Sequence, residues 1–398
     1  MNYSQGVPPS PGTQYVAPLL AEPLTAAPFR NLERRKWLYG NWLLRGYVSL
    51  LAAPGGTGKT AYGLAVAGTI LLDDAILGEQ IHDATRNVWY INLEDSREEM
   101  LLRLQAFCIA HGVNPDELAG RLFLNSGQDR RFVIAQPDGL GMIMPSPDKD
   151  QIIMQIQANN IGLIIVDPFA GSHYGRESNA EDMTVVMDAW KQVAKEGNCA
   201  VLLIHHTRKG GNGNGDGEDF RGSTAIINAA RAAVGLVRMG ENDQLGVEKE
   251  EWWQYLRLYN AKLNLAPPTE KSLWFKLVPV ELPCGENVQT VKRWDPKGTL
   301  FEGLDMTACV RVLETIRDGL PNGDRYRLGR VGPGAARWAG KLLIAEGKND
   351  GQAKYILRAW ATNGLLEETS YYSKAARKDQ PGLEVNDTLL QKMRRQIP

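Results

Sequence analysis

A glycine-rich turn that carries a lysine and a threonine is the strongest chemical signal in the sequence. Residues 47–72 read YVSLLAAPGGTGKTAYGLAVAGTILL, an apolar run, a tight turn and a segment of helix formers. Glycines at 55, 56 and 58 let consecutive backbone N–H groups approach an anion, because no side chain blocks them. The order strand, glycine turn, helix therefore predicts a loop that binds the phosphates of a nucleoside triphosphate.

The residues around the turn have distinct roles in this prediction. The helix that follows points its positive end at the same anion. Lys59 is expected to reach the β and γ phosphates, and the hydroxyl of Thr60 is expected to ligate Mg²⁺. The predicted nucleotide-binding segment is Pro54, Gly55, Gly56, Thr57, Gly58, Lys59, Thr60 and Ala61.

One position departs from the usual pattern. The motif GxxxxGK[ST] would begin with glycine, and here it begins with Ala53. We expect a slight cost, because alanine is small and the remaining glycines carry the bend. The alternative interpretation is a glycine-rich turn that contains GKT without binding a nucleotide.

Carboxylates follow two apolar runs that are expected to be strands. IGLIIVDP ends in Asp167, which is predicted to hold Mg²⁺ through water, or alternatively to cap the next turn. NLED places Glu94 at the end of another strand, at the edge where ligands of open α/β folds bind. Glu94 is a candidate general base for the attacking water, or alternatively the start of the next helix.

A histidine pair ends the run LLIHHTRK. A histidine there can respond to the γ-phosphate and transmit its presence to the following loop, and alternation along the strand favours His206 over His205. The alternatives are a structural histidine and a zinc site. We discount zinc because no third or fourth ligand lies at a useful spacing.

The next segment, KGGNGNGDGED over 209–219, has five glycines between 210 and 217. It cannot offset the entropy of a fixed structure by burial, so we expect it to be mobile in the free protein. Arg208 and Lys209 are predicted to close on a polyanion in a central channel, and the alternative is a linker without a partner. Arg221 and Arg231 follow in an apolar context, where a guanidinium needs an anion. That anion is either a neighbouring subunit's γ-phosphate or an intrachain carboxylate.

Composition limits the other classes of function. The chain of 398 residues has a formal net charge of −1, which argues against a uniformly basic nucleic-acid binder but not against a basic pore or small basic domain. The four cysteines are scattered without a CxxC pair, which favours reduced thiols. No apolar run reaches transmembrane length and no secretory signal begins the chain, so we expect a cytoplasmic protein without a membrane partner.

Alternating apolar strands and helical segments indicate an α/β fold with a doubly wound, mainly parallel sheet. The predicted organisation is a flexible proline-rich leader over 1–28, the core over 29–285, a linker over 286–304 and a further domain over 305–398. Residues 252–280 are expected to add antiparallel strands to the sheet's end. Residues 127–150 are expected to form a long surface loop or a β excursion.

The last domain has its own pattern. Residues 301–398 contain sixteen Lys or Arg against twelve Asp or Glu, and a helix over 351–362 precedes two predicted strands joined by a basic turn. Helix, strand, turn and strand are the outline of a winged helix, which contacts DNA through the helix and the wing, or alternatively contacts protein. The predicted phosphate contacts are Lys354, Arg358, Lys374, Arg377 and Lys378.

Five segments in this order resemble the RepA-type hexameric replicative helicases, which are RecA-like P-loop ATPases of plasmids and mobile elements. The segments are WLYGNWLLRGYVSLLAAPGGTGKT, WYINLEDSREEMLLRLQAF, LIIVDPFAG, LLIHHTRKG and RGSTAIINAARAAVGL. The resemblance covers about residues 30–265 and implies a RecA-like fold in a ring with ATP at subunit interfaces. It implies that Lys59 and Thr60 bind nucleotide and Mg²⁺, Glu94 is the base, Asp167 serves the metal and His206 senses the γ-phosphate. It also implies that Arg231 is the arginine finger and that Lys262 acts in trans.

These features together predict an ATP-dependent motor that translocates on single-stranded DNA. Duplex DNA is a further candidate partner, through the C-terminal domain. The homo-oligomer is expected to be a hexamer. The alternative is an ATPase switch that assembles on DNA or a partner without unwinding. A metabolic P-loop kinase is less favoured, because no second substrate signature appears and Arg231 would have no role. The chain continues for roughly 130 residues beyond the end of the resemblance, a departure from the smaller RepA-type helicases.

Overall fold

The structure of the protein is a computed structural model. It describes residues 21, 23–24, 32–207, 224–241, 243, 245, 247–267, 272–296, 303–329 and 336–395. Contacts divide the chain into two units, Met1–Arg35 and Lys36–Pro398, and every described helix and strand belongs to the second. Apart from 21, 23 and 24, the predicted leader lies outside the described residues, and so does the glycine segment 209–219.

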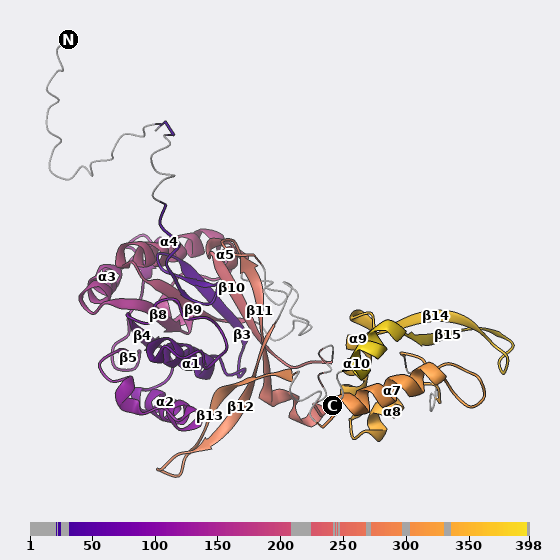
Figure 1. Cartoon of the computed structure of the whole chain (residues 1–398). Helices are drawn as coiled ribbons and strands as arrows, with labels where there is room; N and C mark the ends of the chain where they lie inside the picture. The colour runs from indigo at the N-terminus through magenta and orange to yellow at the C-terminus, as the bar shows by residue number, and fades with distance from the viewer. Residues whose placement is uncertain are drawn as a thin grey trace. The chain divides into compact units, whose positions relative to one another are not determined.

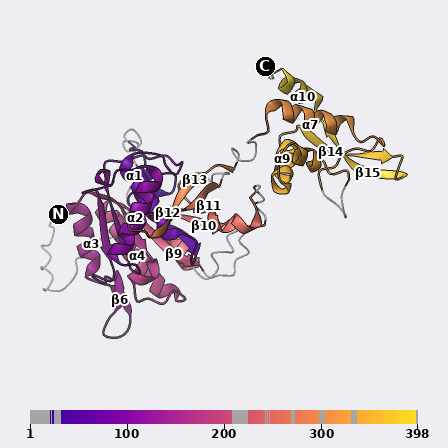
Figure 2. The same cartoon turned by 90° about the horizontal axis from the view of Figure 1, so that it is seen from below.

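A nine-stranded sheet organises the larger part of this unit (Figures 1 and 2). Its strand order is β13-β12-β11-β10-β3-β9-β8-β4-β5. The strands from β10 to β5 are parallel, and β11, β12 and β13 extend the sheet as antiparallel strands. The bounds are β3 Val48–Pro54, β4 Asn87–Asn92, β5 Leu122–Ser126, β8 Ile161–Asp167, β9 Ala200–Thr207, β10 Ala232–Arg238, β11 Tyr255–Leu263, β12 Leu273–Glu281 and β13 Asn287–Trp294. The predicted α/β class with a mainly parallel sheet is confirmed.

Helices cover both faces of the sheet. Residues of α1 and α2 share one apolar cluster, and residues of α3, α4 and α5 share the cluster on the other face. Because both faces are covered, a central strand such as β8 is buried throughout and reads as a continuous apolar run. The bounds are α1 Lys59–Leu72, α2 Arg97–His111, α3 Asp148–Ala158, α4 Ala180–Gly197 and α5 Thr224–Ala229, with short 3-10 turns η2 Pro115–Glu117, η3 Phe169–Ser172 and η5 Lys249–Gln254.

Two small hairpins lie outside the main sheet. β1 (Trp37–Tyr39) pairs with β2 (Leu43–Leu44), and β6 (Ala135–Pro137) pairs with β7 (Ile143–Pro145). The second hairpin lies within 127–150, so of the two expectations for this segment the β excursion is confirmed.

The predicted linker over 286–304 is wrong in its first half. β13 spans Asn287–Trp294 and pairs along its whole length with β12. The sheet therefore continues past residue 285, where the core was predicted to end. The turn between these strands looked like a boundary in the sequence, because a hairpin turn and the start of a linker share the same Pro, Gly and Asn composition.

Residues from Leu304 onward form an apolar cluster of their own, which reaches Leu390. The elements are α7 Met306–Asp318, α8 Gly340–Ala345, α9 Asp350–Thr362, β14 Leu366–Ser373, β15 Lys378–Val385 and α10 Asp387–Arg394. The predicted order of helix, strand, basic turn and strand is present in α9, β14 and β15 (Figure 1). The two strands β14 and β15 pair as an antiparallel hairpin. A winged-helix identity for this region stays a prediction. Within the described ranges, no helix has both the length and the apolar character needed to cross a membrane.

Candidate nucleotide site

The glycine turn has the backbone geometry of a phosphate loop. β3 ends at Pro54, and α1 begins at Lys59. Gly56 and Gly58 have φ angles of 72° and 95°, in the left-handed region that glycine adopts without strain. The loop opens toward the N-terminus of α1, where a helix favours an anion.

Ala53, the departure from the usual motif, lies inside β3 rather than in the bend. It is 1% exposed and pairs with His206 in the parallel register of β3 and β9. An extended strand position imposes no left-handed backbone, so glycine is not required there. The substitution is therefore compatible with a working loop.

The side chain of Lys59 lies within the turn. Its Nζ donates to the carbonyl of Pro54 at 3.4 Å and lies 3.3 Å from Nδ1 of His206. Burial lowers the pKa of Lys59, and the charges of Asp167 and Glu94 oppose that change. A lysine that contacts the loop's own carbonyl is placed to exchange this weak contact for a phosphate oxygen.

Thr60 and Asp167 place two side-chain oxygens, which could ligate a metal ion, next to each other at the loop. The hydroxyl of Thr60 donates to Oδ2 of Asp167 at 2.7 Å, and the hydroxyl of Tyr90 donates to the same oxygen at 2.8 Å. Burial raises the pKa of Asp167, and these hydrogen bonds oppose the change. A hydroxyl, a carboxylate, phosphate oxygens and water are the ligand set that Mg²⁺ prefers, so these residues fit the predicted metal.

Glu94 is exposed at the carboxyl end of β4, and Asn92 holds its backbone. Oδ1 of Asn92 accepts hydrogen bonds from the N–H groups of Glu94, at 2.9 Å, and Asp95, at 2.7 Å. The charge of Glu94 influences the pKa of both Lys59 and His206. Its carboxylate therefore belongs to the same electrostatic environment as the phosphate loop.

The two histidines of β9 face opposite sides, as the alternation predicted. His205 is 2% exposed, packs edge-on against Phe169 and has its pKa lowered by burial to about 4. His206 is exposed and faces Lys59, and burial and the Lys59 charge lower its pKa. The orientation of His206 suits the predicted sensor, whereas His205 is part of the core.

Arg231 lies at the opposite edge of the sheet from this site. It directly precedes β10, whose first residues pair with the start of β3. The carboxyl edge is the edge of the sheet formed by the C-terminal ends of the parallel strands, where the phosphate loop lies. At roughly 3.3 Å a residue, β10 separates Arg231 from this edge by roughly 20 Å, and an arginine side chain cannot span that distance. Arg231 therefore cannot reach the phosphate loop of its own chain.

Lys262 is engaged within the chain. Its Nζ donates to the carbonyls of Ile227, Asn228 and Ala230, each at 2.9 Å. An ammonium has three N–H donors, so all of them are used at the end of α5. This arrangement favours a helix-capping role over the predicted role in trans.

Other predicted residues fall outside this site. Arg208, Lys209 and Arg221 lie outside the described residues. Lys354 lies on α9 and pairs with Asp350 at 2.6 Å. The remaining predicted DNA contacts are exposed, one on α9 and the others around the β14–β15 turn: Arg358, Lys374, Arg377 and Lys378.

Three residues of the site were not predicted from the sequence. Asn92 positions Glu94, and Tyr90 positions Asp167. Nη2 of Arg238 donates to the carbonyl of Gly56 at 2.5 Å. Asn two residues before Glu94 is a recognisable turn signal. Arg238 ends β10 at the carboxyl edge, but its closeness to the loop depends on β10 pairing with β3, which the sequence does not reveal.

One family model agrees with the fold described above. The family model described as AAA domain matches residues 19–212, a span that includes the phosphate loop, Glu94, Asp167 and His206. The sheet, the loop geometry and this match together support a RecA-like P-loop ATPase. Among solved structures, the crystal structure of the RadB recombinase is similar with 15% identity and a TM-score of 0.38, over 60% of this chain and 89% of that chain.

Proposed function

We propose that the protein is a ring-shaped, ATP-dependent motor of the RepA type that moves on single-stranded DNA, with six subunits in the ring. The observation that carries the proposal is the position of Arg231. It is exposed at the edge of the sheet that lies away from the phosphate loop. An arginine finger in this place can only serve a nucleotide bound to another copy of the chain.

The residues of the carboxyl edge divide the chemistry of hydrolysis. Lys59 binds the β and γ phosphates, and Thr60 and Asp167 would hold Mg²⁺, which would supply neutralisation of phosphate charge. Glu94 takes a proton from the attacking water, and Asn92 fixes the backbone that presents it. His206, in contact with Lys59, registers whether the γ-phosphate is present and passes this state to the segment after β9.

Coupling to DNA is assigned to the segment over 207–222 and to the C-terminal domain. In this proposal the segment grips the strand while ATP is bound and releases it after hydrolysis, so sequential hydrolysis around the ring draws the strand through. Arg208, Lys209 and the basic residues of α9 and the β14–β15 turn supply phosphate contacts.

A mixing experiment tests the shared site. Lys59→Ala removes the phosphate-loop lysine, and Arg231→Ala removes the finger, so each variant alone should lose turnover while Arg231→Ala still binds ATP. In a mixture, the intact loop of one variant meets the intact Arg231 of the other, and ATPase activity should return in part. If Arg231→Ala hydrolyses ATP at the normal rate, the finger lies elsewhere, with Arg221 the next candidate.

A second measurement separates the motor from the switch. The purified protein should split a forked DNA duplex only with ATP and Mg²⁺, and DNA should stimulate its ATPase activity. Hydrolysis and DNA binding without fork splitting would identify the switch. Turnover per subunit that stays constant on dilution, from a species shown to be monomeric with ATP bound, would overturn the ring altogether.

A further inference from the structure

A cationic pocket lies at the amino edge of the sheet, between the end of α4 and the start of β10. Its volume is about 350 Å³, and its lining includes Arg231, Lys191, Lys195, Tyr47 and Asn228. This volume is at the lower end of the range for ligand pockets. Figure 1 shows α4 and α5 side by side at this edge, and the two helices are in contact.

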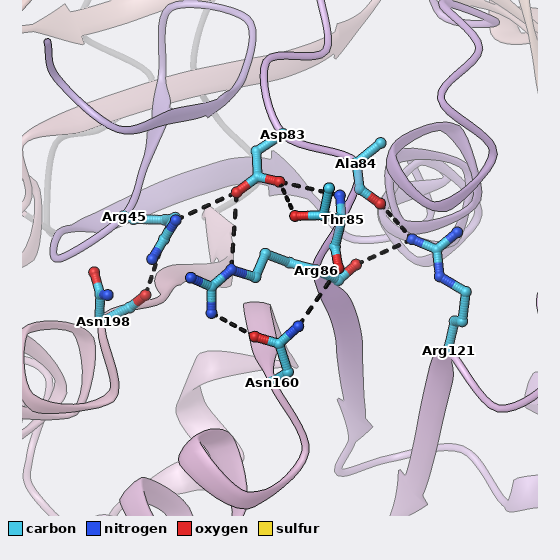
Figure 3. A network of polar contacts seen from close by, with 8 residues as sticks. All are labelled: Arg45, Asp83, Ala84, Thr85, Arg86, Arg121, Asn160 and Asn198. Carbon is cyan, nitrogen blue, oxygen red and sulfur yellow. Dashed lines mark hydrogen bonds and ion pairs between the residues drawn. The ribbon is translucent and has the colours of Figure 1, made fainter.

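The walls of the pocket are tied together by hydrogen bonds. Nε of Arg45 donates to the carbonyl of Asn198 at 3.0 Å, and the N–H of Gly46 donates to the carbonyl of Cys199 at 2.8 Å. Figure 3 shows Arg45 held between Asn198 and Asp83 in this network. The N–H of Arg231 donates to the carbonyl of Val48 at 3.1 Å. The backbone of Gly46 and of Arg231 is therefore held in place before any ligand arrives.

The lining of the pocket concentrates positive charge. Lys191 and Lys195 are four residues apart on α4 and so share one face of the helix. No carboxylate is among the lining residues. Lys191 forms an ion pair with Asp188, an exposed residue that does not line the pocket. Among the described residues, none forms an ion pair with Arg231 or Lys195. Burial, and then the charges of Arg231 and Lys191, lower the pKa of nearby Lys262.

A structural explanation covers only part of this arrangement. A lysine in the last turn of a helix, such as Lys195, complements the helix dipole. The dipole effect fades within one turn, so it does not account for Lys191 or for Arg231. Three cations therefore line one cavity, and of these Lys191 has a carboxylate partner, Asp188. An anion in the cavity would reduce their mutual repulsion.

We propose that this pocket receives the terminal phosphates of the nucleotide bound to a neighbouring copy, and that Lys191 and Lys195 hold them together with Arg231. The inference rests on the proposed function, since it assigns the same interface two more residues. The planar guanidinium of Arg231 suits the transferring phosphate, and the two ammonium groups add point charges that neutralise the remaining oxygens. The pocket cannot serve its own chain, because the phosphate loop lies at the other edge of the sheet.

The first test measures binding of inorganic tripolyphosphate by calorimetry in the Lys59→Ala background, where the phosphate loop is impaired. Adding Lys191→Ala and Lys195→Ala should weaken tripolyphosphate binding at least tenfold. Lys292→Ala, a change of an exposed lysine on β13, is the matched control and should leave binding unchanged. Equal affinity with and without the two α4 lysines would overturn the proposal.

The second test assigns the phosphate to a neighbour. The Lys191→Ala/Lys195→Ala protein should bind ATP normally, lose at least tenfold in turnover and regain activity when mixed with Lys59→Ala. Normal turnover in this double variant, with Arg231→Ala inactive, would overturn the inference and leave the proposed function intact. Normal turnover in both variants would overturn the proposed function as well. The pocket could bind tripolyphosphate while the mixture fails to regain ATPase activity. That result would overturn the neighbouring copy's nucleotide as the source of the phosphate and would indicate a site for a free phosphate.

Discussion

The two edges of one sheet differ in how their charges are balanced. At the carboxyl edge, cations and acids occur together: Lys59 lies near Glu94 and Asp167, and Thr60 donates to Asp167. At the amino edge, Arg231 and Lys195 have no ion-pair partner among the described residues, and the lining of their pocket contains no acid. The first edge has the groups of a hydrolytic site, whereas the charged side chains that line the pocket at the second edge are all cations.

Under the proposed function, the two edges are complementary halves of one site. A sheet is stiff, so the length of β10 holds Arg231 away from its own phosphate loop in every state of the folded subunit. Only contact between two copies can bring the halves together. A functional division of this kind makes activity depend on assembly, and variants at each edge should therefore fail in different ways.

The largest expected effect is that of Lys59→Ala at the carboxyl edge. Hydrolysis should fall by roughly 10³, because the main cation on the β and γ phosphates is removed from a preorganised site. The amino edge of this variant is intact, so it should still activate a neighbour that has a normal loop. Steady-state ATPase assays of the pure and mixed proteins measure both effects, and a pure Lys59→Ala protein with normal turnover would contradict the comparison.

Glu94→Gln should lower turnover by roughly 10², because general-base catalysis contributes at least that much. ATP affinity should stay within about twofold, since the hydrogen bond from the Glu94 backbone to Asn92 is retained. The matched control is Asp95→Asn, whose carboxylate is already engaged by Asn92 and Arg103. If the control loses turnover and Glu94→Gln does not, the base is Asp95.

A smaller effect is expected for Arg238→Ala, which frees the carbonyl of Gly56. Loss of one hydrogen bond from a charged donor corresponds to about 1.5 kcal/mol, or about tenfold in ATP affinity. KM should rise while kcat stays nearly constant, because the guanidinium positions the loop rather than the reacting phosphate. A fall in kcat at unchanged KM would instead indicate that Arg238 contacts the transferring phosphate. Part of the role proposed for the arginine finger would then belong to the subunit that binds the nucleotide.

Glu79 belongs to neither edge's set of charges and should affect stability alone. Burial raises its pKa from 4.5 to about 7, although the indole of Trp42 donates to its Oε2 at 2.6 Å. The folded state then binds a proton more tightly than the unfolded state, so stability falls as pH rises from 4.5 to about 7. Over this pH range the free energy of unfolding falls by about 3 kcal/mol in total.

Glu79→Gln should remove this decline and raise the free energy of unfolding above pH 7 without changing turnover. Denaturant unfolding at several pH values measures the difference, and exposed Glu250→Gln is the control. A changed ATPase rate in Glu79→Gln would show that charges outside both edges contribute to catalysis.

Much of the fold could be predicted because its signals are local. The helix over Arg97–His111, the strand over Ile161–Asp167 and the phosphate loop follow from residue periodicity and glycine placement within short windows. The end of the core could not be predicted in the same way. β13 belongs to the sheet only through its pairing with β12, and its sequence reads much like a polar connection.

The amino-acid sequence determined the chemistry of the carboxyl edge, because glycines, Lys59, Thr60 and strand-end acids have roles that depend on residue type and on nearby chain geometry. Tertiary structure decided which residues share an edge. Arg231 and Arg238 lie at the two ends of one strand, and only the parallel pairing of β10 with β3 puts Arg238 on the phosphate loop and Arg231 away from it. Strand pairing joins segments that are far apart in the chain, so no local pattern in the sequence encodes it.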